Sequence, residues 1–426
     1  MPEYRQKANA NSKRVHANQT CLPRAVPRHE RKNLTSHGTS YPLGIWNGQA
    51  KWQTATPTAV FQILVEELLG YNVHVEVSNS GVAQHVLYAL AGCAEPTADN
   101  DDERGCNGQR TAFHAAAGVY LTNEVEQHWQ QVQRMRMGGM LEDLSSLGFP
   151  SYSGIYVDGR TQDLAEDHER LFLDDYRSYD SKYQNPKHWF ASIHDINTSS
   201  LIPCKRWKGT LPLGLETFLR NFDTLEVDLA LDFTGQEIVP YCPDGYWWLS
   251  NACRNNPTDC IPCVTGSSLN YVYDADEVMI KATTWNMSLA LATVDGHSAG
   301  TDFEKLVTEH RILFYFWEPD LTFRTKRAEL IAFPEFNEQQ WNLGNKATMA
   351  QALDLRIVSH WNLETLAPDV RDLMINMDVS TVEALRMMYA SAEAVQRMRA
   401  ALGRELELQE WWQGGWMGAC EWLLEK

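Results

Sequence analysis

The stretch that decides the fold is Thr56-Pro-Thr-Ala-Val-Phe-Gln-Ile-Leu-Val-Glu-Glu-Leu-Leu-Gly-Tyr-Asn-Val-His-Val-Glu-Val77. Its first part predicts a helix, because Thr56 is a good N-cap, Pro57 suits the first helical position and Gly70 suits a helix end. The apolar residues of this part recur at helical spacing, whereas the part from Tyr71 alternates as a strand does. A helix is therefore followed almost directly by a strand.

The same alternation continues on both sides of this stretch. Tyr41-Pro-Leu-Gly-Ile-Trp46 is a strand candidate before it, and Ser80 to Gly92 is a helix candidate after it. Strands that alternate with helices favour a layered α/β fold. Val278 to Val294 fits either a strand or a helix. Near the end of the chain, the capping box Ser380-Thr-Val-Glu383 begins a helix that we expect Gly414-Gly415 to break.

Composition and charge narrow the functional class. The chain has 426 residues, of which 44% are apolar, enough for one two-lobed domain or for two to three small domains. It contains 15 Trp, a residue enriched at recognition surfaces. Residues 1–40 hold eight Lys and Arg against two Asp and Glu, so the remainder carries −24 of a total net charge of −18. So acidic a body argues against nucleic-acid or anionic-membrane binding and is compatible with a cationic ligand.

Neither a membrane span nor a signal peptide is visible in the sequence. No wholly apolar run exceeds six residues, as in Ile312 to Trp317, whereas a spanning helix needs about 20. Residues 1–40 are polar and basic without an apolar segment, which predicts a disordered leader rather than a signal peptide. The acidic run Asp99-Asn-Asp-Asp-Glu103 predicts a solvated loop, because the Gly and the later Glu of a calcium-binding EF-hand are missing.

The nine cysteines allow several interpretations. Six of them lie close together in loop-like sequence, as the pairs Cys93 with Cys106, Cys242 with Cys253, and Cys260 with Cys263. In an oxidising compartment these pairs would form disulfides. Alternatively, Cys260-Ile-Pro-Cys263 is a redox motif, or the last four of these cysteines bind zinc.

Two aromatic stretches are candidates for a binding site. In Tyr241-Cys-Pro-Asp-Gly-Tyr-Trp-Trp-Leu-Ser-Asn-Ala-Cys253, three adjacent rings follow a Pro-Asp-Gly turn. Three rings on a turn cannot all enter one core, so at least one should face a cavity or a partner. The alternative is a loop pinned to a core by its rings. The second stretch, Arg311-Ile-Leu-Phe-Tyr-Phe-Trp-Glu-Pro319, predicts a buried strand that ends on Trp317, because Pro319 cannot continue a ladder.

Several landmarks in this chain occur in a characteristic order: Glu67-Leu-Leu-Gly-Tyr71, Glu124-Val-Glu-Gln-His-Trp129, Leu147-Gly-Phe with Gly154-Ile-Tyr-Val157, Cys242-Pro-Asp-Gly-Tyr246, Phe314-Tyr-Phe-Trp-Glu-Pro319, Leu366-Ala-Pro-Asp-Val370 and Trp422-Leu. As an ordered set over residues 41–426 they resemble the substrate-binding proteins of glycine betaine, proline betaine and choline ABC importers. The Leu147 to Val157 segment is similar to the segment that crosses between lobes in that family.

This resemblance implies an α/β, two-lobed periplasmic-binding-protein-like fold with a hinge and a central ligand cleft. Residues 41–140 and 321–426 would form lobe 1, and residues 141–320 lobe 2. The family's ligand carries a quaternary ammonium group, which has no N–H to donate and is attracted to the faces of aromatic rings.

Carried over by position, the resemblance implies an aromatic box of Trp129, Tyr246 and Trp317. Backbone N–H groups near Trp247 and Trp248 would meet the ligand carboxylate. The family's loop Trp is replaced here by Tyr246 with Trp247 beside it, so either ring is a candidate for that wall. Trp52 is a further candidate, with a core ring as the alternative.

The function predicted from these features is capture of a quaternary-ammonium solute, such as glycine betaine or choline, for ABC-type transport or for sensing. An ABC permease is the candidate partner, no cofactor, metal or nucleic acid is expected, and the location would be extracellular or periplasmic. Two alternatives stay open. One is an enzyme using scattered groups, namely Asp228, Asp232, His188, His194 and His310. The other is a secreted lectin-like module that binds sugars on its Trp side chains.

Overall fold

The computed structural model describes residues 20–47, 52–77, 83–98, 105–106, 111–121, 129–130, 132, 141–209, 242–268, 271–272, 275–295, 302–321, 323, 326–404 and 406–426. The predicted acidic loop at Asp99–Glu103, together with Asp228 and Asp232, lies outside these ranges. The chain divides into two compact units. Unit 1 comprises Met1–Ser151, Pro319–Leu321 and Leu353–Lys426, and unit 2 comprises Tyr152–Glu318 and Thr322–Ala352.

Unit 1 is built on a mixed sheet with the strand order β4-β3-β5-β15-β6. Its strands are β3 (Leu43–Asn47), β4 (Val73–Val77), β5 (Ala115–Tyr120), β15 (Leu353–His360) and the first part of β6 (Leu141–Val157). Strands β3, β4 and β5 run parallel, and β15 is antiparallel to β5 and β6. The predicted strands at Tyr41–Trp46 and Tyr71–Val77 therefore correspond to β3 and β4.

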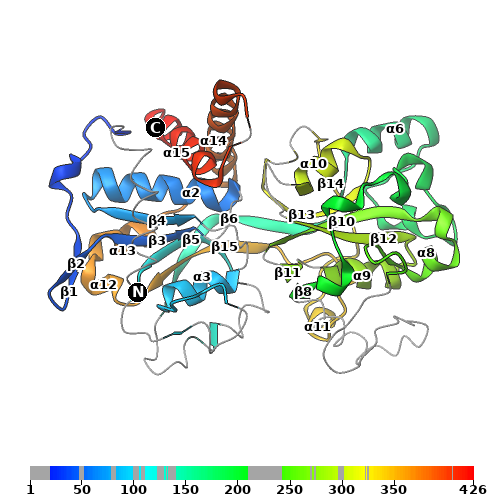
Figure 1. Ribbon diagram of the computed structural model, residues 1–426, viewed down its shortest axis with the longest axis horizontal. Coiled ribbons are helices and arrows are strands. Elements are labelled where there is room, and N and C mark those ends of the chain that lie inside the picture. Colours follow the sequence, from blue (N-terminus) through cyan, green and yellow to red (C-terminus); the bar gives the residue numbers. More distant parts are fainter. Residues whose placement is uncertain are drawn as a thin grey trace. The chain divides into compact units, whose positions relative to one another are not determined.

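The helices of unit 1 lie on both faces of this sheet. They are α2 (Trp52–Ile63), which continues as a π-helical turn (Leu64–Leu68), α3 (Ala83–Leu90), α12 (Leu363–Leu366), α13 (Pro368–Ile375), α14 (Thr381–Leu402) and α15 (Leu408–Leu424). Figure 1 shows α2, α14 and α15 on one side of the strands and α3 on the other. Every residue of α2 is buried, because β5 packs on one side of the helix and α14 and α15 on the other. The layered α/β prediction is confirmed.

Helix α2 starts earlier than predicted. It begins at Trp52, four residues before the expected cap at Thr56, so that Pro57 lies inside the helix. The backbone N–H of Trp52 donates to the Asp320 carboxylate at 3.1 Å, which satisfies one of the free donors of the helix N-terminus. That partner is 268 residues away in the sequence and could not be found from local pattern.

Helices α14 and α15 confirm one prediction and correct another. The Ser380 hydroxyl accepts from the Glu383 N–H, as the capping box predicts. The helix ends at Leu402 with Gly403 in the left-handed region, and the predicted break at Gly414-Gly415 is wrong, since both glycines lie inside α15. A Cβ on Gly414 would come within 2.6 Å of the Val395 side chain, so the glycine permits close packing of the two helices.

Residues 20–40, predicted as part of a disordered leader, are structured. Strand β1 (Leu34–Ser36) pairs with β2 (Thr39–Tyr41), and Cys21 forms a disulfide with Cys420 of α15. The buried Glu67 carboxylate accepts the backbone N–H groups of Cys21 and Leu22 at 2.7–3.0 Å. The prediction of disorder was wrong for these residues because Cys420 and Glu67 hold them in place, and composition alone does not reveal such distant partners.

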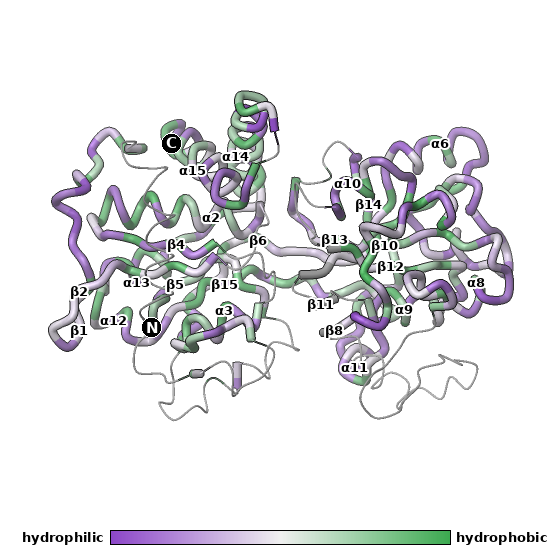
Figure 2. Tube along the Cα trace, viewed as in Figure 1, coloured by the Kyte–Doolittle hydropathy of each residue, from purple (hydrophilic) through white to green (hydrophobic). Residues whose placement is uncertain are grey.

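Unit 2 contains a second sheet region, in which β13 lies between β6 and β10. Its strands are the second part of β6, β7 (Leu201–Ile202), β8 (Lys208–Gly209), β9 (Trp248–Leu249), β10 (Ile261–Ser268), β11 (Tyr271–Val272), β12 (Leu289–Asp295), β13 (Leu313–Glu318) and β14 (Glu329–Leu330). Strand β10 is parallel to both β12 and β13, and β13 is antiparallel to β6. The apolar composition of β12 and the hydrophilic composition of α6 (Gly159–Glu169) are visible in Figure 2.

The other helices of unit 2 include α8 (Asn251–Asn255), α9 (Ala275–Thr284), α10 (Asp302–Glu309) and α11 (Glu338–Asn342). The ambiguous stretch Val278–Val294 thus divides between α9 and β12. A turn at Trp285–Met287 separates the two, with Asn286 at a φ of +49°. Both periodicities are present in that stretch, which is why neither predominated in the sequence.

β6 is one continuous strand of 17 residues that supplies both units, and the units change at Ser151. Leu147-Gly-Phe lies at a bulge within this strand. Pairing with β15 passes from Asp354 opposite Pro150 to Arg356 opposite Ser146, and Gly148 there has a φ of +99°. Here β6 advances four residues while β15 advances two, and extra residues in one strand produce such a register shift without ending the strand.

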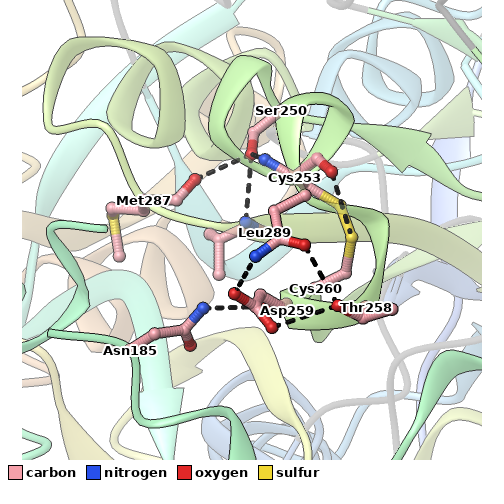
Figure 3. The surroundings of a disulfide bond; sticks show 9 residues. Asn185, Ser250, Cys253, Thr258, Asp259, Cys260, Met287 and Leu289 are labelled. Carbon is pink, nitrogen blue, oxygen red and sulfur yellow. Dashed lines mark hydrogen bonds between the residues drawn. A yellow bond between two sulfur atoms is a disulfide. The ribbon is translucent and has the colours of Figure 1, made fainter. Parts of the chain in front are cut away.

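Disulfide pairing agrees with the sequence prediction in one case and corrects it in two. Cys93 pairs with Cys106 as predicted, but Cys242 pairs with Cys204, and Cys253 pairs with Cys260 across 5.0 Å between Cα atoms (Figure 3). Cys263 is a free, fully buried thiol on β10, between β12 and β13. Burial raises the pKa of this thiol, which disfavours the reactive thiolate, and the predicted Cys260–Cys263 pair is absent.

Two further properties concern only the ranges that the structure describes. Within them, no helix has both the length and the apolar character needed to cross a membrane. No group of three or more His, Cys, Asp or Glu side chains there is arranged to hold a metal ion. Three of the four cysteines considered for zinc are in disulfides instead.

Candidate functional site

Trp317 lies near the end of β13 and is the ring of that strand with the most exposed surface. Its side chain is 9% exposed, whereas Phe314, Tyr315 and Phe316 are 0–2% exposed. The strand ends at Glu318, one residue beyond the predicted end at Trp317 and just before Pro319. Strand alternation places Tyr315 and Trp317 on one face, where their ring centroids lie 5.3 Å apart with the planes at 80°. This is the edge-to-face arrangement that aromatic pairs prefer.

A group of buried charges holds Tyr315. Its hydroxyl donates to Glu277 Oε2 at 2.8 Å, and the other carboxylate oxygen of Glu277 pairs with Lys281 Nζ. Lys281 Nζ also donates to the Lys346 carbonyl at 2.9 Å and lies 5.1 Å from the centre of the Phe333 ring. Sequence analysis did not identify this group. The Glu277-x-x-x-Lys281 spacing on a helix was the available signal, since residues four apart share a face.

The aromatic loop before β9 turns only one of its three rings outward. Trp247 and Trp248 are each 1% exposed in the core of unit 2, whereas Tyr246 is half-buried and packs against that core. The indole N–H groups of both tryptophans have no hydrogen-bond partner in the described part of the chain. Tyr246 therefore has a ring surface available, and Trp247 does not.

The backbone of the loop is already hydrogen-bonded. Asp244 Oδ1 accepts from the N–H groups of Tyr246 and Trp247, both at 2.9 Å, and the Cys204–Cys242 disulfide fixes the start of the loop. Trp248 is paired in β9 against β12. The Trp247 N–H, which was predicted to donate to a ligand carboxylate, donates to Asp244 in this structure.

Two further predicted residues belong to unit 1. Trp129 is half-buried and helical. Trp52 is 4% exposed and its ring packs on Trp411 of α15, with 4.7 Å between centroids. These surroundings are those of a core ring, which was the alternative interpretation of Trp52.

Unit 2 also has a surface hollow of about 610 Å³ that contains none of the predicted ligand residues. Its lining is Asn185, Lys187, His188, Phe190, Ala191, Ser192, Asp195, Asp259 and Arg311. Burial lowers the pKa of Lys187, whose ammonium donates to the Ala191 carbonyl at 2.6 Å. The lining carries both signs of charge and one aromatic ring, so it lacks the several ring faces that would hold a quaternary ammonium group.

Of the groups considered for an enzyme, the three histidines make no hydrogen bond to one another in the described part of the chain. His188 pairs with Glu169 at 2.8 Å on the surface, and His194 is exposed in a short 3-10 turn. His310 follows the end of α10. Nucleophilic or acid–base catalysis needs such groups within hydrogen-bond reach of one another. No such arrangement of these histidines occurs among the described residues.

No protein-family model matches this chain, and no curated protein sequence matches it. Several solved structures are similar. Lactococcal OpuAC, in its closed-liganded conformation complexed with glycine betaine, is 12% identical over 89% of this chain and 98% of that one, with a TM-score of 0.40. The glycine betaine, L-proline-binding protein ProX from Borrelia burgdorferi is 10% identical over 88% and 99%, with a TM-score of 0.41.

An ABC-transporter choline-binding protein in complex with choline is 10% identical over 90% of this chain and 97% of that one, with a TM-score of 0.39. These three are substrate-binding proteins of the class that the sequence motifs resemble.

Proposed function

We propose that this chain is a solute-binding protein for a small quaternary-ammonium compound such as glycine betaine or choline. The ordered motifs over residues 41–426 support this function, and the observation that carries it is Trp317. This ring stands near the end of β13, is the least buried of its strand, and is held edge-to-face by Tyr315. A trimethylammonium group cannot be selected by donating N–H groups, but the faces of aromatic rings attract it.

The ligand residues proposed are Trp317, Tyr246 and Trp129, with Trp247 and Trp52 as weaker candidates. Tyr246 is favoured over Trp247 because only Tyr246 has ring surface outside the core of unit 2. Trp52 ranks lowest because its ring is already packed on Trp411. The proposed role is binding without catalysis, either feeding an ABC permease or serving as a sensor.

The disulfides support a location outside the cytoplasm. Eight of the nine cysteines form four pairs: Cys21–Cys420, Cys93–Cys106, Cys204–Cys242 and Cys253–Cys260. Disulfides of this number persist in oxidising compartments and are rare in the cytosol. An extracellular or periplasmic protein is therefore proposed.

Titration calorimetry of the full oxidised chain tests this function. The ligands are glycine betaine, choline and carnitine, with 3,3-dimethylbutan-1-ol as the uncharged isostere of choline and glucose as a neutral sugar. Saturable binding of one onium compound, without binding of the isostere, is the expected result. Binding of glucose alone would replace the proposal with a carbohydrate-binding function, and turnover of a ligand without added cofactor would replace it with an enzymatic one.

Substitutions at Trp317 separate attraction to the ring face from simple apolar burial. We expect Trp317→Leu to weaken onium binding by about 2- to 30-fold, because one ring contributes about 0.5–2 kcal/mol to cation binding. Trp317→Phe should weaken binding less, because it keeps an aromatic ring. Trp189→Ala is the matched control, because Trp189 is a half-buried ring of unit 2 that donates to Glu169 at 3.2 Å on the surface. Equal affinities of the wild type and Trp317→Leu would exclude Trp317 from the site.

A further inference from the structure

Unit 2 buries four charged side chains in one cluster. Asp276, Glu277 and Lys281 of α9, together with Lys346, are each at most 5% exposed. Glu277 pairs with Lys281, and Lys346 Nζ lies 2.9 Å from Asp276 Oδ2. Buried ion pairs contribute little net stability compared with apolar side chains, because desolvation offsets the attraction; their best-attested use is to specify one geometry. We therefore expect this cluster to fix the geometry of the side chains that it contacts.

The side chain of β13 that the cluster holds is Tyr315. The Tyr315 hydroxyl is hydrogen-bonded to Glu277 at 2.8 Å, and its ring is 1% exposed. The carboxylate is in turn fixed by Lys281, whose ammonium is anchored on the Lys346 carbonyl at 2.9 Å. A tyrosine ring held by packing along its sides and by a charge-assisted hydrogen bond at its tip has one orientation available.

Tyr315 transmits this constraint to Trp317. The two side chains share a face of β13, with centroids 5.3 Å apart and planes at 80°. Phe316, which precedes Trp317 in the chain, makes a more distant contact of 6.2 Å between centroids. The plane of Trp317 therefore depends on the orientation of Tyr315. Cation–π attraction requires the cation to lie over the ring face, so a tilt of that plane lowers affinity.

We propose that Glu277, acting through the Tyr315 hydroxyl, is a positioning residue that sets the ring plane of Trp317 for a cationic ligand. The ligand part of this inference rests on the proposed function. Glu277 does not touch the ligand in this arrangement. It acts on Trp317 indirectly, through its hydrogen bond with Tyr315 and the edge-to-face contact between the Tyr315 and Trp317 rings.

The test uses Tyr315→Phe, which deletes the hydroxyl and keeps the ring. Tyr179→Phe is the matched control, because Tyr179 is also 1% exposed in unit 2 and donates its hydroxyl to the Leu173 carbonyl at 2.7 Å. Both variants lose one buried hydrogen bond, and Tyr315→Phe should lose the more stability, because its acceptor is a carboxylate. Only Tyr315→Phe is expected to weaken onium binding, by about three- to tenfold, which lies within the contribution of one ring to cation binding.

A second readout follows Trp317 without any ligand. In chains labelled with 5-fluorotryptophan, the variant Trp317→Phe identifies the fluorine resonance of Trp317. That resonance is expected to shift or broaden in Tyr315→Phe and to stay in place in Tyr179→Phe. Combining Tyr315→Phe with Trp317→Leu should cause no further loss of affinity beyond Trp317→Leu alone, because the hydroxyl acts only through the ring at position 317.

The outcomes distinguish the inference from the proposed function. An unmoved Trp317 resonance in Tyr315→Phe, or equal onium affinities in Tyr315→Phe and Tyr179→Phe, overturns the positioning role. Additive affinity losses in the double variant overturn the route through Trp317. If the wild-type chain binds no onium compound, the proposed function and the ligand part of the inference fall together. The fluorine spectrum then decides independently whether Tyr315 fixes Trp317.

Discussion

The disulfide between Cys21 and Cys420 should be the most stabilising covalent link in the chain. It joins residues 399 apart in sequence, both in unit 1. In the chain-entropy account, closing a loop of that length lowers the conformational entropy of the unfolded chain by the equivalent of about 6 kcal/mol. The 13-residue separation of Cys93 and Cys106 corresponds to about 3 kcal/mol. Measured values are commonly smaller than these, but the order of the two should be retained.

The double variants Cys21→Ala/Cys420→Ala and Cys93→Ala/Cys106→Ala make the comparison. Guanidinium denaturation of the oxidised proteins, followed by circular dichroism, gives the free energy of unfolding of each. We expect the first variant to lose about 2–5 kcal/mol and more than the second. Adding dithiothreitol to the wild type should cost at least as much as the first variant loses, since it reduces all four disulfides.

An equal or smaller loss in Cys21→Ala/Cys420→Ala would refute the reasoning. It would mean that the entropy of closing the long loop does not set the contribution of this disulfide. Removal of the long link would then release little additional freedom.

Three further predictions test separate features. Burial, with a smaller contribution from His360, lowers the pKa of His114 to about 3, so below pH 6.5 the unfolded chain binds a proton that the folded chain does not. Stability should therefore fall by about 1.4 kcal/mol per pH unit between pH 6.5 and 3, and His114→Asn should flatten that slope in denaturation midpoints measured against pH. Ser250→Ala should lower the free energy of unfolding by about 2–4 kcal/mol, because the Ser250 hydroxyl donates to Met287 and accepts from Cys253 and Leu289 (Figure 3). Thr258→Ala, at an exposed position, should change it by no more than about 0.5 kcal/mol. Gly148→Ala should lower the free energy of unfolding by more than about 2 kcal/mol, because a Cβ there would lie 2.7 Å from the Val379 nitrogen. Gly403→Ala, where a Cβ would meet open space, should lower it by about 1 kcal/mol. Similar unfolding free energies for the two variants would contradict this.

Local features of the fold were predictable from the sequence. The Ser380 cap, the left-handed Gly70 after α2 and the alternation of β4 each depend on residues within a few positions of one another. The N-terminus of α2 was not predictable, because its partner Asp320 is distant in the sequence, and neither was the continuity of α15 through Gly414, which permits close packing against Val395 of α14. Cysteine pairing divides in the same way: the Cys93–Cys106 pair follows from proximity in sequence, and the Cys204–Cys242 pair does not.

For the candidate site, the sequence indicated which aromatic stretches to examine but not which rings carry surface. Among Tyr246, Trp247 and Trp248, the pattern required at least one ring outside the core, and burial identifies Tyr246. The Asp244 carboxylate that occupies the Trp247 N–H is only three residues away, yet its acceptor role depends on the turn conformation. Glu277 and Lys346 were not identified at all, because a buried charge is recognisable only by its partner.

The sequence by itself determined the layered α/β class, the succession of strand and helix around Thr56–Val77, the end of β13 before Pro319 and the acidic, Trp-rich character that is compatible with a cationic ligand. These depend on composition and on contacts of short sequence range. Only the tertiary structure decided the division into two units within β6, the ordering of residues 20–40 by Cys420 and Glu67, and the ranking of the aromatic rings by exposure. The physical reason is that burial and partner choice are set by segments hundreds of residues apart, and a local pattern records only that a side chain needs a partner, not which one it finds.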